Sequence, residues 1–213
     1  KNFRVLGHQR LYKWTVEAAK QCLGSDGLSR IIISTDKPDL LDPTDRVMAE
    51  KRPKKMMGDD VEAWKIVKET ADRIMDYDAY MMLQPTSPFR TADDIREALI
   101  VFRRTATFGT LCSINRETHL QNGAIFIWKR NQIAGLPYQE TFFGMDKIGS
   151  LEIDTEDDWF IAEAVAKHIL LQRSHTHSKT NEFSGQLKTY ILFGSSDRPY
   201  GQTHILSSYS QAT

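Results

Sequence analysis

The apolar residues of the chain follow two alternating patterns, short continuous runs and longer helical repeats. The continuous runs predict strands that are buried on both faces, and they cover residues 30–33, 79–83, 110–114 and 124–128. Between them, apolar residues recur every three or four positions, as on one face of a helix. These repeats predict helices over 11–22 and 61–75, after Thr91 and after Thr155, and Asp42-Pro43 predicts a short helix over 43–51.

Strands that alternate with amphipathic helices are typical of one fold class. The pattern predicts an α/β fold with a doubly wound, mostly parallel sheet and helices on both faces. We expect Ile31–Ile33 and Met81–Leu83 to be central strands of that sheet. Residues 1–171 would form this α/β domain, and residues 172–213 a polar linker and C-terminal tail or fragment, with one more strand over 188–194.

Composition and charge limit the kinds of partner that the chain can bind. Lys and Arg total 28 and Asp and Glu total 28, so the formal net charge is zero, which argues against nucleic-acid binding through a broad basic face. No apolar run approaches the roughly 18 residues of a membrane span, and we expect no signal peptide. Cys22 and Cys112 are expected to be buried, reduced thiols, which indicates a cytoplasmic protein.

Two polar loops directly follow predicted strands. Ser34-Thr35-Asp36 ends the run at 30–33, and Gln84 to Arg90 follows the run at 79–83. Ligands of open α/β sheets bind outside the carboxyl ends of the strands, so these loops are candidates for a binding site. The chain contains no GxGxxG, Walker A or GxSxG sequence, so dinucleotide, P-loop and serine-hydrolase functions have no support.

The segment 152–158 is strongly acidic. If Glu152 and Asp154 lie at a strand end, their side chains project to the same face, and neighbouring carboxylates repel unless a cation lies between them. Such hard oxygen ligands suit Mg²⁺, which binds one or two carboxylates together with substrate phosphates. Glu156, Asp157 and Asp158 instead fall in the first turn of the next helix, where negative charge stabilises the N-terminus.

Several longer motifs occur in order and carry a family resemblance. They are Lys1-Asn2, Trp14 to Ala19, Ser34-Thr35-Asp36, Arg52-Pro53, Gln84 to Arg90, Asn122 to Phe126 and Glu152 to Thr155. With these motifs the chain resembles the acylneuraminate cytidylyltransferases, the CMP-sialic acid synthetases, over roughly residues 1–171.

The resemblance implies a nucleotide-diphospho-sugar transferase fold and a defined reaction. Such enzymes use CTP, Mg²⁺ and a nine-carbon acidic 2-keto sugar, and they release pyrophosphate. The resemblance assigns catalytic roles to Lys1 and Asp154, and metal binding to Glu152 and Asp154. It assigns nucleotide binding to Lys1, Asn2, Ser34, Asp36 and Arg52, and sugar binding to Gln84, Thr86 and Asn122.

The chain also departs from the family pattern. The family's phosphate-binding loop lies before Lys1, where this sequence begins, so we expect this chain to bind CTP weakly. Glu152 replaces an aspartate, and Ser113-Ile114 continues to Asn122 without a longer family segment that helps to build the sugar pocket and the dimer contact.

Alternatives to this assignment therefore stay open. One is a truncated or decayed homologue that keeps the fold and lacks catalysis, and another is a related transferase for another base or sugar. The sequence does not decide whether the acidic sugar is sialic, legionaminic or pseudaminic acid. A homodimer is possible.

Overall fold

The protein is described by a computed structural model. It describes residues 1–24, 28–41, 44, 46–57, 61–74, 77–105, 108–133 and 140–173. The α-helices are α1 (Leu11–Lys20), α2 (Ala63–Arg73), α3 (Ala92–Arg104) and α4 (Glu156–Arg173). The strands are β1 (Val5–Leu6), β2 (Gln9–Arg10), β3 (Ile31–Thr35), β4 (Val47–Lys51), β5 (Ala79–Leu83), β6 (Thr110–Asn115), β7 (Gln121–Lys129) and β8 (Thr141–Met145).

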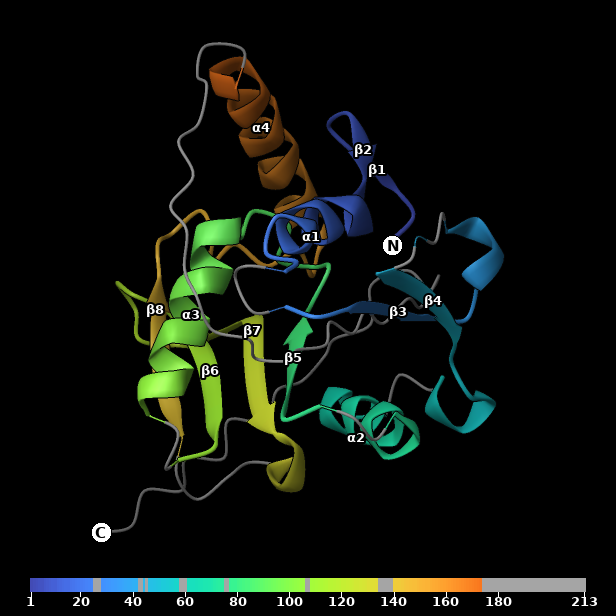
Figure 1. Cartoon of the computed structure of the whole chain (residues 1–213). Helices are drawn as coiled ribbons and strands as arrows, with labels where there is room; N and C mark the ends of the chain where they lie inside the picture. Colours follow the sequence, from blue (N-terminus) through green and yellow to red (C-terminus); the bar gives the residue numbers. More distant parts are fainter. Residues whose placement is uncertain are drawn as a thin grey trace, which may run out of the picture.

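The described strands pair into a mixed sheet arrangement (Figure 1). One sheet has the order β5-β7-β6-β8, with β7 antiparallel to both neighbours and β8 parallel to β6. β3 and β4 form a parallel pair, and β1 and β2 a short antiparallel pair. The predicted α/β class is therefore confirmed, but the four-stranded sheet is mixed. β7 is antiparallel because a short turn joins it to β6, and a parallel pair would need a longer crossover.

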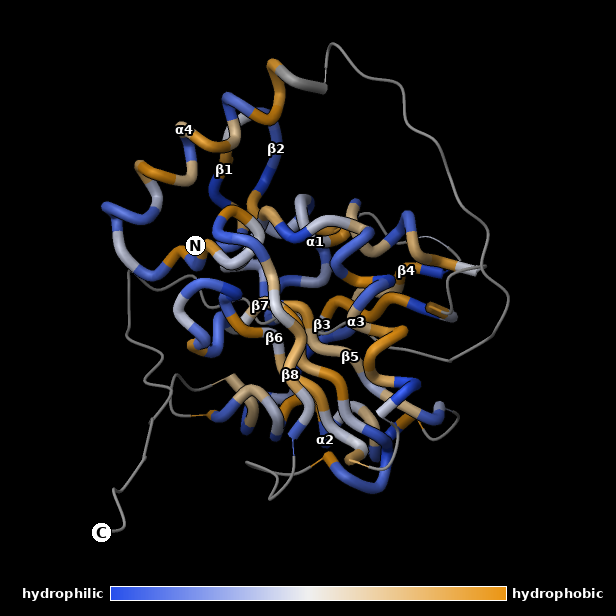
Figure 2. The backbone as a smooth tube through the Cα atoms, turned by 90° about the vertical axis from the view of Figure 1, so that its left-hand side faces the viewer, coloured by the Kyte–Doolittle hydropathy of each residue, from blue (hydrophilic) through white to orange (hydrophobic). Residues whose placement is uncertain are grey.

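Two hydrophobic cores lie on the two sides of the strands. Ile31 and Ile33 join Met81 and Leu83 in the core beneath α1 and α3, while the alternate residue Ile32 joins Tyr80 and Met82 in the core beneath α2. The strands accordingly form a continuously apolar centre in Figure 2. β3 and β5 are buried at every position, as predicted. Their predicted place at the centre of the sheet is wrong for the described residues, because each pairs with a single strand and is covered by helices rather than by a second neighbouring strand.

The helix predicted over residues 43–51 is wrong. Val47–Lys51 forms β4, which pairs in parallel register with β3 from Ile31 opposite Val47 to Thr35 opposite Lys51. Apart from Val47, the residues of this segment have no strong strand propensity, so the pairing with a buried strand decides the conformation. The correction matters for the site, because β4 delivers Arg52 to the end of β3.

Helices α3 and α4 both begin with a side-chain cap. Thr91 and Asp94 form the predicted capping box at α3. At α4, Asp158 accepts hydrogen bonds from the backbone N–H groups of Asp154 and Thr155, at 3.0 and 2.8 Å. Burial opposes ionisation of Asp158, but these bonds together with the Thr155 hydroxyl lower its pKa. Asp158 thus has the capping role that the sequence predicts for it.

Helix α4 packs on the N-terminal part of the chain through Trp159, Ala162 and Ala166, which share a third core with Leu11 and Trp14. It runs to Arg173, slightly past the predicted domain boundary at residue 171. The predicted tail and its strand over 188–194 lie outside the described residues. Cys22 and Cys112 are buried free cysteines, as predicted. None of the described helices is long and apolar enough to cross a membrane.

Candidate active site

The residues predicted for the nucleotide side meet at the ends of β3 and β4. Arg52 is buried, and its guanidinium donates to Ser34 twice, from Nε to Oγ at 3.3 Å and from an Nη to the carbonyl at 3.0 Å. The Arg52 N–H also donates to the Thr35 carbonyl at 2.8 Å. Burial lowers the pKa of Arg52, while the nearby charge of Asp36 raises it. The structure therefore brings Ser34, Asp36 and Arg52 together.

The residues predicted for the sugar side follow β5 and reach towards the acidic segment. The Thr86 hydroxyl lies 3.5 Å from Gln84 Oε1 and also donates to Glu152. The Thr86 carbonyl accepts from the Ile153 N–H at 2.8 Å. These contacts join the loop after β5 to the segment before α4, so Gln84, Thr86 and Glu152 share one site.

Gly123 on β7 makes this junction possible. Its φ of +65° lies in the left-handed region, and an added Cβ would lie 3.0 Å from Oε1 of both Gln84 and Glu152. Any other residue would strain the backbone and push these two side chains away. The lack of a side chain at position 123 therefore lets Gln84 and Glu152 approach the same backbone.

Asn122 lies beside this junction but faces into the protein. Its Oδ1 accepts from the Ser113 hydroxyl and from the Ala124 N–H, and its Nδ2 donates to Ser150 Oγ at 2.9 Å. Asn122 is only 5% exposed. Its predicted contact with the sugar stays a prediction, and the structure shows its amide bonded to β6, β7 and the loop that carries Ser150.

Glu152 and Asp154 lie in a segment without regular secondary structure, so the expectation of a strand end is wrong. Ile153, between them, is instead tied to Thr86 and packed in the third core. The two carboxylates still interact. Burial, together with the neighbouring charge of Asp154, raises the pKa of Glu152 to about 7, against the opposing charge of Lys1. The pair is thus a partly buried, mutually repelling set of acids.

Lys1 lies against the acidic segment of the site. Its Nζ lies 3.5 Å from Asp154 Oδ1, in an ion pair. The adjacent Asn2 is buried, and its carbonyl accepts from the Tyr12 N–H at 3.1 Å, which fixes this segment to α1.

Glu152 and Asp154 offer a divalent cation two carboxylate ligands, but not a complete set. Within the described ranges, no group of three or more His, Cys, Asp or Glu side chains could hold a metal ion. A closed protein site is therefore not formed by these residues. A pair of carboxylates in which the Asp154 charge opposes ionisation of Glu152 nevertheless fits Mg²⁺, which takes its remaining ligands from water and phosphate.

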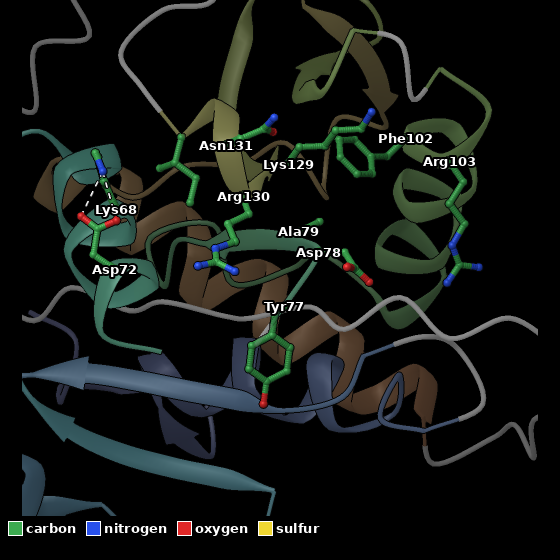
Figure 3. A pocket seen from close by; sticks show the side chains of 11 residues that line it. Lys68, Asp72, Tyr77, Asp78, Ala79, Phe102, Arg103, Lys129, Arg130 and Asn131 are labelled. Carbon is green, nitrogen blue, oxygen red and sulfur yellow. Dashed lines mark hydrogen bonds and ion pairs between the residues drawn. The ribbon is translucent and has the colours of Figure 1, made fainter. Parts of the chain in front are cut away.

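A separate cavity of about 900 Å³ lies at the opposite end of the sheet (Figure 3). It opens where β5 starts and β7 ends, between Tyr77, Ala79 and Lys129. Lys68 on its wall is paired with Asp72 at 2.9 Å. None of the predicted site residues lines this cavity, so it is distinct from the polar cluster around Lys1.

Comparisons with known proteins agree with the motifs. No protein-family model matches the chain. The N-acylneuraminate cytidylyltransferase of Escherichia coli O18:K1:H7 (strain RS218 / NMEC) is 24% identical over 227 residues, covering 85% of this chain and 53% of that protein. The chain is related to the acylneuraminate cytidylyltransferases. It spans about half the length of this curated relative.

The fold of this chain also occurs among solved structures. A CMP:2-keto-3-deoxy-manno-octonic acid synthetase, solved in complex with CTP, superposes with a TM-score of 0.60 at 12% identity, over 79% of this chain and 92% of the other. This likeness supports the predicted nucleotide-sugar transferase fold.

Two residues of the candidate site received no role from the sequence. Gly123 and Arg90 both belong to recognisable motifs, but their spacing indicates nothing of their contacts. The role of Gly123 depends on a close approach of Gln84 and Glu152, and that of Arg90 on its burial among three elements. Both are properties of the folded chain.

Proposed function

We propose that the chain is a cytidylyltransferase that activates a nine-carbon acidic 2-keto sugar of the sialic acid type with CTP. The products would be the CMP-sugar and pyrophosphate. One observation carries the proposal: Gln84, Thr86 and Glu152 meet at Gly123, next to the Lys1–Asp154 ion pair, and the same chain brings Arg52 to Ser34 at the ends of β3 and β4. The relation to the acylneuraminate cytidylyltransferases supports assigning the first cluster to the nucleotide and the second to the sugar.

The proposed reaction joins the two ligands at the α-phosphorus of CTP. The anomeric hydroxyl of the sugar forms the new O–P bond and loses its proton, while the bond to the departing pyrophosphate breaks. Lys1 and Arg52 supply positive charge for the phosphates, because catalysis of such a step is mostly positioning and charge neutralisation. Gln84 and Thr86 offer amide and hydroxyl groups to the sugar.

A magnesium ion belongs to this proposal, with Glu152 and Asp154 as the residues that would hold it. When bound, Mg²⁺ would neutralise charge on the phosphates of CTP. Without the ion, Lys1 is the cation that offsets the Asp154 charge, at 3.5 Å. The chain's own contribution is to hold the Glu152 carboxylate beside Thr86 and Gly123, and the Asp154 carboxylate beside Lys1.

Pyrophosphate release tests the proposal directly. The full chain is incubated with CTP, Mg²⁺ and one of four acids: sialic, legionaminic, pseudaminic or 2-keto-3-deoxy-manno-octonic acid. We expect release with at least one of the nine-carbon acids, and none when ATP, GTP or UTP replaces CTP. Release with none of the acids, or with the octonic acid alone, would contradict the proposed function.

Gln84→Ala is expected to raise the KM for the sugar far more than the KM for CTP. The side chain follows a buried strand and lies against Gly123, so the amide is held in place for a polyhydroxylated ligand. Each lost hydrogen bond should raise the KM roughly tenfold. Steady-state kinetics with each substrate varied in turn measures both values.

The matched control for this prediction is Gln21→Ala. Gln21 is exposed, and its amide donates to the Glu17 carbonyl of α1. This variant should retain both wild-type KM values. If the two KM values of Gln84→Ala rise together, Gln84 does not act on the sugar.

A further inference from the structure

Arg90 is a buried cation at the end of the loop that follows β5. Only 2% of the residue is exposed, so its guanidinium is shielded from solvent and does not face the polar cluster directly. Burial lowers its pKa to about 9, and the charge of Asp94 only partly opposes this. Transfer of such a charge from water is costly unless hydrogen bonds replace those to water.

The guanidinium binds oxygens from three separate elements. One Nη donates to the Ala124 carbonyl on β7. The other donates to the carbonyls of Gln84 and Ser87 in the loop, and to the Thr15 hydroxyl on α1. The distances to Ser87 and Thr15 are both 2.8 Å. Arg90 therefore ties the loop to the sheet and to a helix at once.

All four acceptors are neutral oxygens. No ion pair of Arg90 occurs within the described part of the chain, and its buried Nε has no hydrogen-bond partner there. If this position served only to fill the core, an apolar side chain would do so without the cost of burying a charge. The fixed fork of donors is what the guanidinium adds and a hydrocarbon cannot supply.

The groups that Arg90 holds are the two sides of the sugar cluster. The Gln84 carbonyl belongs to the residue whose side chain approaches Gly123, and Ala124 is the next residue after Gly123. Arg90 thus sets how far the loop backbone lies from β7. That separation fixes where the Gln84 amide stands relative to Gly123 and Glu152.

We propose that Arg90 is a positioning residue for recognition of the acidic sugar. Its guanidinium fixes the backbone of Gln84 against β7, so that the Gln84 amide and the Thr86 hydroxyl are presented in one geometry. Arg90 does not touch the substrate. This inference rests on the proposed function and extends it from the residues that would contact the sugar to the buried group that places them.

Arg90→Lys and Arg90→Gln test the inference, because a positioning role predicts a change in the KM for the sugar and not in the KM for CTP. Neither side chain can bridge the four oxygens as the guanidinium does, so the loop should shift in both variants. We expect the sugar KM to rise roughly 10- to 100-fold, because a small displacement of positioning groups has effects of this size. The CTP KM should stay close to that of the wild type, and calorimetric titration with the sugar acid alone should show the same loss.

Thr15→Val and Thr15→Ser provide a second, gentler test. Thr15 is fully buried on α1 and meets the loop only through Arg90 among the hydrogen bonds described here. Valine removes the acceptor at nearly constant volume, whereas serine keeps it. We expect Thr15→Val to raise the sugar KM several-fold and Thr15→Ser to resemble the wild type. If the Arg90 variants do not fold, the comparison of Thr15→Val with Thr15→Ser tests the positioning role.

The outcomes separate the inference from the function on which it rests. A wild-type chain that turns over no acidic sugar overturns both. An active wild type whose Arg90 or Thr15→Val variants lose thermal stability but keep the sugar KM shows that Arg90 only stabilises the fold. Equal rises of both KM values would also overturn the positioning role.

Discussion

Asp154→Asn is expected to slow pyrophosphate release on the order of 10²-fold, taking the scale of a single acid–base group as a floor. Asparagine keeps the size of the side chain but removes its charge, and with it the attraction for a divalent cation. The ion pair with Lys1 Nζ, at 3.5 Å, is lost as well. Turnover measured across a range of Mg²⁺ concentrations should show a weaker magnesium dependence in the variant.

Asp157→Asn is the control for this prediction. Asp157 is exposed in the first turn of α4, three residues along the chain, and it carries the same charge. It should retain wild-type turnover and magnesium dependence. An Asp154→Asn variant with the magnesium dependence of the wild type would remove Asp154 from the proposed metal site.

Glu152→Gln is expected to lower activity and, without metal, to raise thermal stability at high pH. The folded-state pKa of Glu152, about 7, lies above its ordinary value of 4.5. The folded chain therefore holds this proton more tightly, and wild-type stability falls as pH rises from about 4.5 to 7. A shift of this size corresponds to at most about 3 kcal/mol. Glutamine cannot ionise, so the variant does not lose stability as pH rises. Its melting temperature should therefore exceed that of the wild type by several degrees at pH 8 and by little at pH 4.

The measurement uses thermal melts in EDTA at both pH values, with Glu117→Gln as the control. Glu117 is exposed in the turn between β6 and β7, so its replacement should leave the melting temperature unchanged at either pH. Added Mg²⁺ should then stabilise the wild type more than Glu152→Gln. A Glu152→Gln variant that is less stable than the wild type at pH 8 would show that ionised Glu152 does not destabilise the folded chain.

The strands and helices with strong patterns could be predicted from the sequence, and those fixed by pairing could not. Continuous β-branched or apolar runs placed β3 and β5, and helical spacing placed α1 and α4. β4 carries helix-compatible residues, and its strand conformation comes from its ladder with β3. Long-range pairing of this kind leaves little trace in local sequence.

The candidate site shows the same division. The position of Ser34 and Gln84 after buried strands predicted them as site residues, because ligand-facing loops follow the carboxyl ends of strands. The structure places them at the ends of β3 and β5, and their contacts with ligands stay predictions. The argument from strand periodicity failed at Glu152 and Asp154, since that segment is irregular and held by Thr86. Arg90 lay within a known motif, yet only its burial among α1, β7 and the loop reveals its contacts.

The short turn between β6 and β7 also bears on the order in which the chain folds. Asn115 closes the turn by accepting the N–H groups of Glu117 and Thr118, and its own N–H donates to the Leu120 carbonyl at 2.8 Å. A hairpin with so small a loop forms on a timescale of about 1–10 μs, well before distant strands meet. We therefore expect Ser113 and Asn122 to come together early in folding, and the loop of Gln84 to dock later onto the β6–β7 hairpin.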